Sequence, residues 1–438
     1  MPPFEIKTVG ETVNVGDMFK DAKNGQMVGR GKKRTRESDS HATDSVQKKK
    51  KVHHPCHQDV AGVVLICGEG DVGQLGLGED VMEKARPTLV DIPDKIIQVC
   101  GGGMHTVCLT EKGEVYTFGC NDEGTLGRDT SEDGAETRPG KVEGLPRIVM
   151  VSGGDSHTAA LSEEGKVYIW GNFRDANGHM GLTEEGVKNK PHQILADQEV
   201  IKIASGGDHL VCLTSHGEVY TCGCAEQGQL GRVAECFSQR GGRKGLSYIL
   251  HQAPVHFRSK KCFIEDVFVG QYATFAKDRN GDIYSWGLNN YYQLGFGDMK
   301  NRFVPEKVKA FSKKNFVCVA SGQHHSVTLD NAGNVYTFGR SEYGRLGLGE
   351  NCTETKEPTL VKLDKKCIQI SASNSVSFAL LEDGTVSCWG MGTSKQLGNG
   401  SEDDAWLPTK MDGKQLQDRK VIQVSSGGQH TVLLAVEK

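Results

Sequence analysis

The chain has 438 residues, of which 25% are charged and 37% hydrophobic, and its formal net charge is −4. This composition is ordinary for a soluble globular protein. The longest apolar stretch, residues 60–67, is too short to span a bilayer, so we expect no membrane association. The 14 cysteines include no CxxC pair, which predicts free thiols in an intracellular protein. The 56 glycines follow no Gly-X-Y period, so they indicate many tight turns between short strands rather than collagen.

Residues 1–59 differ from the rest of the chain. They hold 12 Lys or Arg against 8 Asp or Glu, whereas the remainder carries a net charge of −8. Without sustained periodicity or many large apolar residues, this tail is expected to be disordered. Two basic clusters predict a bipartite nuclear-import signal read by an importin, and they can also bind phosphate backbones; a merely solvated charge run is the alternative. The clusters consist of Lys32, Lys33, Arg34, Lys48, Lys49, Lys50 and Lys51.

From residue 60 onward one pattern recurs. A GG-x-H-like turn, a short apolar strand, a glycine turn and a V-Y-x-F/W-G strand are followed by a Leu-Gly pair, as in residues 102–127. Each copy is a hairpin of strands with high β-propensity. The strand-end glycines at 68, 119, 171, 223, 287, 339 and 390 are spaced by 51, 52, 52, 64, 52 and 51 residues. Seven units of this length predict an all-β, seven-bladed β-propeller over residues 60–438.

The two ends of the repeat region are complementary. The last copy, residues 427–434, lacks the second strand of its hairpin, and residues 63–67 form an orphan strand before the first Leu-Gly pair. We expect these two strands to pair and close the ring, which leaves no open edge.

The 64-residue unit contains an insertion of 12 residues between Cys224 and Phe268. Its segment 240–261 has six basic residues and no acidic one, which predicts an anion-binding surface for nucleic acid or an acidic protein, or else a solvated loop. The six are Arg240, Arg243, Lys244, Arg258, Lys260 and Lys261.

Several motifs for catalysis or ligand binding are rejected. Residues 68–73 match G-x-G-x-x-G but precede no helix, and no phosphate-binding loop of the G-x-x-x-x-G-K type occurs. Asp155, Ser156 and His157 are neighbours on a strand, so they cannot form a triad. The group His53, His54, Cys56 and His57 lacks a matching ligand set. We therefore expect no metal, no cofactor and no hydrolytic or redox chemistry.

The motif histidines share one slot of the repeat, which predicts a structural role in anchoring a turn within each blade. They are His105, His157, His209, His325 and His430. The slot before them varies from blade to blade, as in a loop that faces a partner, and it holds His324 and Asp208. Asp155 flanks a similar position on a neighbouring blade.

From about residue 63 to 436 the sequence resembles the regulators of chromosome condensation, a family of chromatin-bound guanine-nucleotide exchange factors for the small GTPase Ran. The resemblance rests on runs such as GCNDEGTLGRDT, SEYGRLGLGE, EDDAW and SSGGQHTVLL. It implies a factor that binds Ran on one propeller face and speeds GDP release without covalent chemistry. Such a factor would generate Ran-GTP near chromosomes for nuclear transport and mitotic spindle assembly.

The resemblance also implies roles for particular residues. A wedge pressed near the phosphate-binding elements of Ran would be Phe173, Arg174, Asp175, Ala176, Asn177 and Gly178, although the family usually has Asn in place of Ala176. The exchange-promoting residues would be Asp155, Asp208 and His324, and further Ran contacts would be Asp71, His105, Arg232 and His430. Arg240, Arg243 and Lys244 would bind the histone acidic patch, and Arg258, Lys260, Lys261 and the tail would bind DNA.

Two other hypotheses for the function remain. One is a propeller interaction module or adaptor without exchange activity, and the other is a scaffold that only binds chromatin. On the leading hypothesis, changing Arg240 and Arg243 weakens nucleosome binding and leaves exchange in solution intact.

Overall fold

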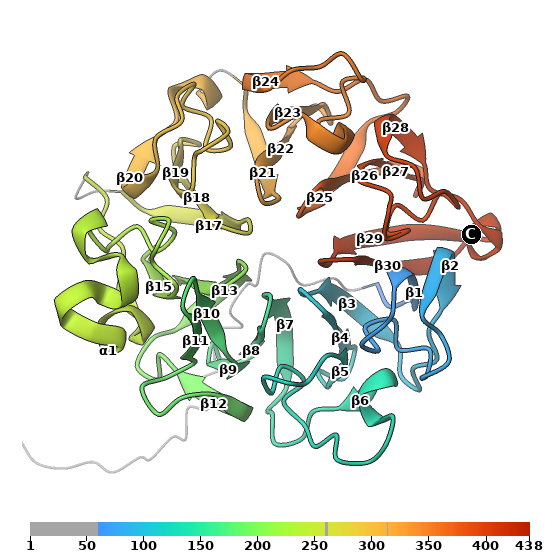
Figure 1. Ribbon diagram of the computed structural model, residues 1–438, viewed down its shortest axis with the longest axis horizontal. Coiled ribbons are helices and arrows are strands. Elements are labelled where there is room, and N and C mark those ends of the chain that lie inside the picture. The colour runs from blue at the N-terminus through green and yellow to red at the C-terminus, as the bar shows by residue number, and fades with distance from the viewer. Residues whose placement is uncertain (1–59, 259–261, 313) are drawn as a thin grey trace, which may run out of the picture. The chain divides into compact units, whose positions relative to one another are not determined.

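The computed structural model describes residues 60–258, 262–312 and 314–438. In this part of the chain, seven four-stranded sheets surround a central axis, and one two-stranded hairpin stands apart from them (Figure 1). The predicted seven-bladed propeller is therefore confirmed. The basic clusters of the tail, and the import signal expected there, lie outside the described residues.

We number the blades I to VII along the chain and give their strands from the axis outward. Blade I consists of β3 (Ile96–Gly101), β4 (His105–Thr110), β5 (Val115–Gly119) and β6 (Gly140–Lys141). Blade II consists of β7 (Ile148–Gly153), β8 (His157–Ser162), β9 (Val167–Gly171) and β12 (Lys188–Ile194). Blade III consists of β13 (Val200–Ser205), β14 (His209–Thr214), β15 (Val219–Gly223) and β16 (Ala253–Pro254). Blade IV consists of β17 (Ile264–Val269), β18 (Ala273–Asp278), β19 (Ile283–Gly287) and β20 (Arg302–Lys307).

Blade V consists of β21 (Phe316–Ser321), β22 (His325–Asp330), β23 (Val335–Gly339) and β24 (Thr355–Leu360). Blade VI consists of β25 (Cys367–Ser373), β26 (Val376–Leu381), β27 (Val386–Gly390) and β28 (Ala405–Lys410). Blade VII consists of β29 (Arg419–Ser426), β30 (His430–Glu437), β1 (Val63–Glu69) and β2 (Glu83–Leu89). The separate hairpin is β10 (Phe173–Asp175) with β11 (Gly178–Gly181). The helices are short: α1 (Gly245–Leu250), α2 (Lys414–Gln417), η1 (Ala135–Thr137), η2 (Glu235–Phe237), η3 (Gln239–Lys244), η4 (Lys309–Phe311) and η5 (Glu342–Gly344).

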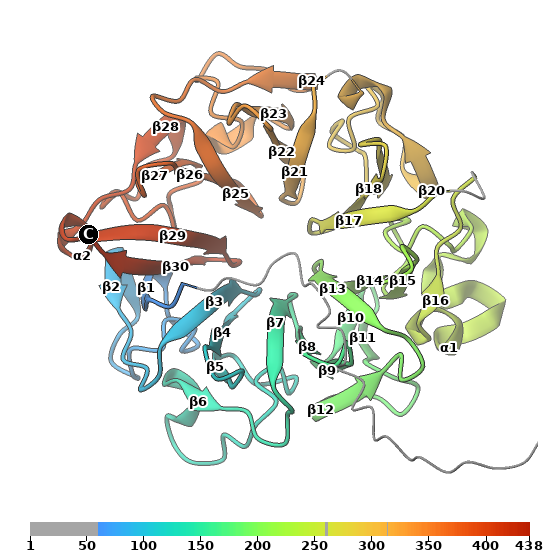
Figure 2. The ribbon, with the colours of Figure 1, turned by 180° about the vertical axis from the view of Figure 1, so that it is seen from behind.

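Blade VII is built from both ends of the propeller. β1 runs antiparallel to β30, from Val63 opposite Ala435 to Gly68 opposite His430. The predicted pairing of the orphan strand with the last repeat is thus confirmed, and Figure 2 shows the blue and red strands side by side in one blade. No helix in the described residues is long and apolar enough to cross a membrane. The described cysteines, from Cys67 to Cys388, are all free thiols.

The V-Y-x-W-G strands and the Leu-Gly pairs recur because they pack on each other between blades. The indole N–H of Trp170 in blade II donates to the carbonyl of Thr125, which lies in the loop of blade I, at 2.8 Å. Gly127 follows in that loop with φ +68°, and a Cβ there would lie 2.7 Å from the Trp170 ring. Glycine is therefore required both for the backbone conformation and for the close approach. Trp286 and Trp389 repeat this contact with Gly231 and Gly347.

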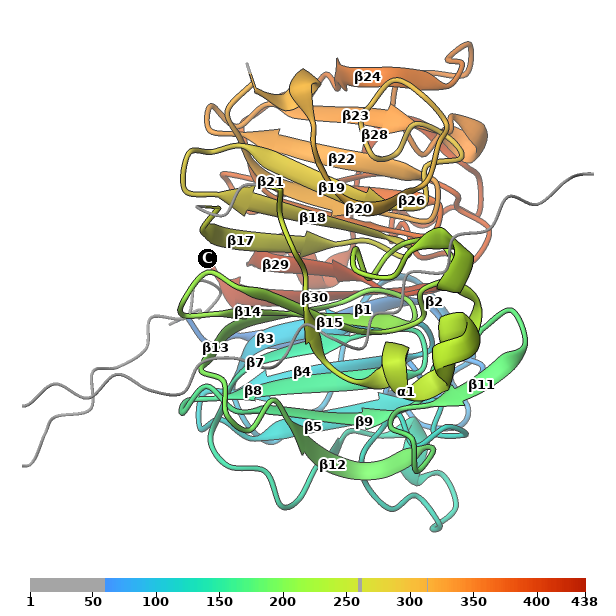
Figure 3. The ribbon, with the colours of Figure 1, turned by 90° about the vertical axis from the view of Figure 1, so that its left-hand side faces the viewer.

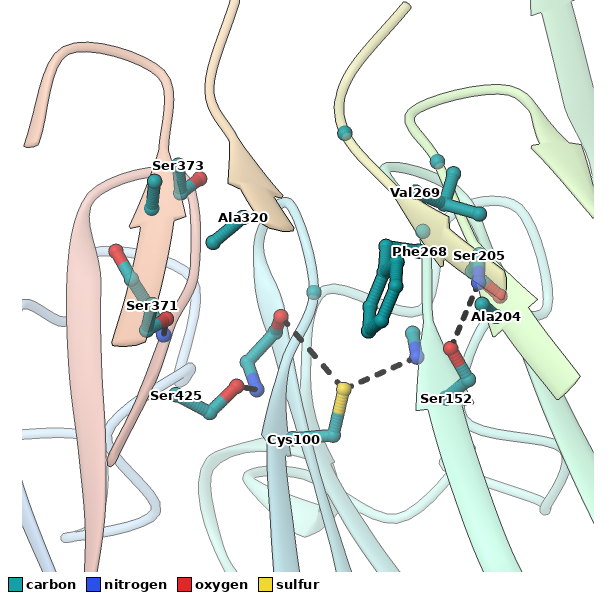
Figure 4. Close-up of a pocket in the computed structure, with 18 of the residues that line it drawn as sticks. Cys100, Ser152, Ala204, Ser205, Phe268, Val269, Ala320, Ser371, Ser373 and Ser425 are labelled. Atoms are coloured by element: carbon teal, nitrogen blue, oxygen red, sulfur yellow. Dashed lines mark hydrogen bonds between the residues drawn. The ribbon is translucent and has the colours of Figure 1, made fainter. Parts of the chain in front are cut away.

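The innermost strands line a central channel of 310 Å³ (Figure 4). Small hydroxyl and thiol side chains join neighbouring blades there. Cys100 accepts the N–H of Gly153 at 3.2 Å, and Ser425 accepts that of Gly101 at 3.0 Å. Farther along the strand, the side-chain amide of Gln98 accepts a hydrogen bond from the N–H of Val151 and donates one to its C=O. These side chains satisfy backbone groups that the inner edge of a sheet would leave unpaired.

The motif histidines are structural, but they join neighbouring blades rather than anchoring a turn within one blade. His105 Nε2 lies 2.9 Å from Thr158 Oγ1 in the next blade, and that hydroxyl donates to the carbonyl of Thr125. Because the hydroxyl proton is already used, the imidazole donates its Nε2–H to the hydroxyl oxygen. His209, His325 and His430 make the same bond to Thr274, Ser377 and Thr106. His157 is an exception, because the next blade offers Leu210 in place of a hydroxyl, and both ring nitrogens lack a hydrogen-bond partner.

Burial lowers the pKa of His105, His157 and His209 to about 3 and that of His430 to about 4. A folded-state pKa below the unfolded value of about 6.5 means that the associated stability is fully present above pH 6.5. It is lost as the pH falls toward 3. We therefore expect the free energy of unfolding, measured in urea, to fall steadily between pH 7 and pH 5.

His209→Gln tests this assignment. The variant should be less stable at pH 7.5 but show a shallower loss of stability on acidification, because one buried imidazole no longer titrates. His216→Gln, at an exposed position in the β14–β15 turn, serves as the matched control and should keep the wild-type slope. Equal slopes in wild type and His209→Gln would contradict the assignment.

Candidate functional site

The turns before each second strand and the loops after each third strand emerge at one end of the blades, because neighbouring strands in a blade are antiparallel. We call this end of the ring the loop face. Asp155, Asp208 and His324 lie on it, in the turns before β8, β14 and β22, and Asp71 lies in the loop after β1. The β10–β11 hairpin replaces such a loop in blade II and projects from the ring (Figure 3). The structure thus brings four of the predicted site residues onto the face that carries the predicted wedge.

The wedge hairpin (residues 173–181) has a buried base. Phe173 is fully buried and packs edge-on against the unpaired ring of His157, with centroids 4.7 Å apart. Asn172, just before the hairpin, accepts the N–H of Gly181 at 2.8 Å and donates to Glu123. The hairpin is therefore fixed where it leaves the sheet.

Carboxylates from both neighbouring blades hold the rest of the hairpin. Asp208 of blade III accepts the backbone N–H of Arg174 at 2.8 Å, and Glu123 of blade I pairs with its guanidinium at 2.7 Å. Glu226 accepts the backbone N–H of Ala176 at 3.1 Å. The hairpin is thus held by charge-assisted hydrogen bonds rather than left as a mobile loop. Glu123 and Glu226 were missed by sequence reasoning, since their importance follows only from lying in the loops that flank blade II in the ring.

Asp155 and Asp208 form an acidic pair beside the wedge hairpin. Burial raises the pKa of Asp155 to about 6, against the hydrogen bond from Gln271. Burial raises the pKa of Asp208 to about 8, and the charge of Asp155 adds to this. Carboxyl groups that are costly to ionise in the free protein become favourable sites once a cationic side chain reaches them. The pair is therefore suited to receive a basic group of a partner.

A cavity of 940 Å³ opens on the loop face next to this pair. Asp155, Asp208 and the hairpin residues Arg174 to Ala176 line one part of it, and Tyr272 lines another. His324 lies farther round the rim, with Nδ1 3.2 Å from Asn290 and its ring edge-on to Tyr291. Burial and the nearby Arg345 and Arg340 lower the pKa of His324 to about 4, so it is neutral at physiological pH.

Three of the expected Ran contacts point into the protein. His105 and His430 are at most 1% exposed and bond Thr158 and Thr106 between blades, so a partner cannot reach them. Arg232 turns its guanidinium to the carbonyls of Tyr248, Ile249 and His251 at the end of α1. It stabilises the insertion of blade III instead of facing outward. Asp71 is exposed, and its carboxylate accepts a hydrogen bond from Gln74 at 2.9 Å.

The six basic residues of the insertion do not form one patch. Arg240 and Lys244 lie in η3 on the loop face, whereas Arg258 follows β16, which leads the chain to the opposite face. Lys260 and Lys261 lie outside the described residues, and so does the side chain of Arg243. Arg240 pairs with Asp175 of the wedge hairpin, and Lys244 rests 4.1 Å over the ring of Tyr248. Segments that are close in sequence thus separate onto two faces, because strand β16 runs between them.

Comparisons with known proteins agree with this architecture. Residues 63–433 match the RCC1-like domain. The chain is 52% identical over 405 residues to the regulator of chromosome condensation of Xenopus laevis, covering 90% of this chain and 96% of that protein. It is 29% identical over 454 residues to the guanine nucleotide exchange factor SRM1 of Saccharomyces cerevisiae, covering 90% and 92%. The crystal structure of Prp20p from Saccharomyces cerevisiae aligns with a TM-score of 0.79 at 28% identity, over 87% of this chain and 93% of that one.

The match spans all seven blades, and more than half of the aligned residues are shared with the Xenopus protein. From the closed ring, the repeat motifs and this identity, it follows that the chain belongs to the RCC1-like domain family.

Proposed function

We propose that this protein is a guanine-nucleotide exchange factor for the small GTPase Ran and that it acts on chromatin. The observation that carries the proposal is the wedge hairpin, which is held beside the acidic pair Asp155 and Asp208 on the loop face. Relatives support it: SRM1 is a guanine nucleotide exchange factor, and the structure of Prp20p was determined with its binding properties to Gsp1p and histones.

The mechanism is differential binding. The loop face binds the GTPase, and the rigid hairpin enters the region that the nucleotide phosphates occupy. A hairpin that is already ordered loses little conformational freedom on binding, so more of the binding free energy stabilises the nucleotide-free GTPase. The barrier to GDP release is lowered without a covalent step, and the direction of exchange follows the cellular excess of GTP.

The acidic pair and His324 supply the polar contacts. Asp155 and Asp208 receive basic side chains of the GTPase, and the carboxylate of Asp155 favours association with a basic surface. His324, neutral and next to Tyr291, offers a hydrogen-bonding group beside an aromatic contact. Asp71 belongs to the outer part of the same surface.

Chromatin would be bound by basic elements outside this surface. On the described chain, Lys244 and Arg258 are available for acidic histone surface and DNA, on opposite faces of the ring. Arg243, Lys260 and Lys261, together with the tail, extend these contacts. The tail also supplies the import signal for an importin, which places the protein in the nucleus.

Asp208→Ala and His324→Ala should each lower kcat/KM for release of labelled GDP from Ran by about tenfold to hundredfold, because a desolvated polar contact is lost. Asp208→Asn keeps an acceptor for the Arg174 N–H and loses only the ability to ionise, so its effect should be smaller than that of Asp208→Ala. Glu163→Gln in the β8–β9 turn, on the opposite face, is the control. Full exchange rates in both alanine variants, with unchanged thermal stability, would refute this site assignment.

Replacing residues 174–178 with a short glycine linker should abolish exchange while the seven blades stay folded, because the hairpin makes no ladder pairs with the blades. Stopped-flow nucleotide release and thermal unfolding measure the two effects. Wild-type exchange by the replaced protein would refute the role of the hairpin as the wedge. An intact protein that releases no GDP from Ran would instead favour an interaction module or adaptor without exchange activity.

Exchange should depend on pH through Asp208. Its raised pKa of about 8 means that the free protein holds a proton there at pH 7, which must leave before a cation of the GTPase can pair. We expect kcat/KM to rise between pH 6 and pH 8.5 for wild type and to rise less for Asp208→Asn. An identical pH profile in the two proteins would speak against this coupling.

A further inference from the structure

A single guanidinium from the insertion of blade III fixes the tip of the wedge hairpin. Arg240 Nε lies 2.7 Å from Asp175 Oδ2, and Nη2 donates to Oδ1 at 3.0 Å. Only 1% of the Asp175 side chain is exposed. The same Oδ1 accepts the backbone N–H of Asn177 at 2.8 Å, inside the turn of the hairpin. This carboxylate therefore joins the hairpin tip to a residue 65 positions away in the sequence.

The backbone of Arg240 has a strained conformation, which indicates a functional role for this residue. Its φ is +45°, a left-handed conformation that side chains other than glycine rarely adopt. Gly241 follows it directly, but glycine is not used at position 240 itself. Such strain persists where the surrounding structure holds it in place, and it is concentrated at functional sites. Here the conformation directs the guanidinium at Asp175.

The charge around the tip explains why a cation is needed. Glu226 accepts the backbone N–H of Ala176 and Glu123 pairs with Arg174, so two acidic side chains already lie against the hairpin before Asp175 is counted. A buried carboxylate without a cation beside it would be costly in this setting. Arg240 offsets the charge of Asp175, and the hydrogen bond from Nη2 to Oδ1 also fixes the orientation of the carboxylate.

We propose that Arg240 is a positioning residue of the exchange site, which holds the wedge hairpin in its active conformation through Asp175. The proposal rests on the exchange function proposed above. It changes the expectation drawn from the sequence, in which Arg240 served chromatin binding and its loss left exchange in solution intact. On the structure, loss of Arg240 acts on nucleotide release even when no nucleosome is present.

The first test needs no GTPase. Hydrogen–deuterium exchange on the full-length free protein reports the protection of the N–H groups of Arg174, Ala176 and Asn177. Arg240→Gln should raise their exchange rates about tenfold, and Arg240→Lys, which keeps one charged donor, should give an intermediate rate. Arg147→Gln breaks an Arg–Glu pair with Glu163 on the opposite face and should leave the hairpin as in wild type. Unchanged protection in Arg240→Gln would overturn the proposal.

The second test is the kinetics of GDP release from Ran in solution. Arg240→Gln should lower kcat about tenfold with KM nearly unchanged, because the hairpin acts after docking. Asp175→Asn removes the same ion pair from the other side, so the double variant should be no slower than the slower single variant. Additive losses, or a wild-type kcat in Arg240→Gln, would overturn the proposal.

The two tests separate the two claims. If the wild-type protein does not release GDP from Ran, the exchange function fails, and Arg240 is a structural contact of the hairpin at most. If the wild type is active and hairpin protection does not depend on Arg240, the exchange function stands and the positioning role fails.

Discussion

The pairing of β1 with β30 is the constraint on which the rest of the structure depends. Six consecutive residue pairs, from Val63–Ala435 to Gly68–His430, join the two ends of the propeller into one blade. Only a closed ring places blade VII against blade I, where His430 bonds Thr106 and Gln423 bonds Val99. Every blade then buries both faces of its middle strands, and the loops of all seven are held at fixed positions on one face.

Because the closed ring is rigid, loops from separate blades together form one partner-facing surface. The wedge hairpin belongs to blade II, yet Glu123 of blade I and Asp208, Glu226 and Arg240 of blade III hold it. Because residues of the neighbouring blades already hold the hairpin in one conformation, it does not have to become ordered when it inserts into a partner. The raised pKa values of Asp155 and Asp208 have the same origin, because the adjacent blades bury these carboxyl groups.

The sequence predicted the features that depend on the repeat period. Seven units, the closing strand and a structural role for the histidines follow from spacing or motif, whereas the wedge residues came from the family resemblance. It failed where the direction of a side chain decides: His105 and His430 point between blades, and Arg232 points to the carbonyls after α1. It also failed where adjacency in sequence differs from adjacency in space, as for Arg240 and Arg258 on either side of β16. The roles of Glu123 and Glu226 required knowledge of the ring order.

Exchange activity requires that the loop face stabilise a GTPase without its nucleotide. The most direct measurement compares the dissociation constants of the full-length protein for nucleotide-free Ran and for Ran bound to GDP, at one pH and ionic strength. We expect nucleotide-free Ran to bind at least about a thousandfold more tightly, since preference for that form is what weakens the binding of GDP in the complex. Equal dissociation constants for the two forms would contradict it.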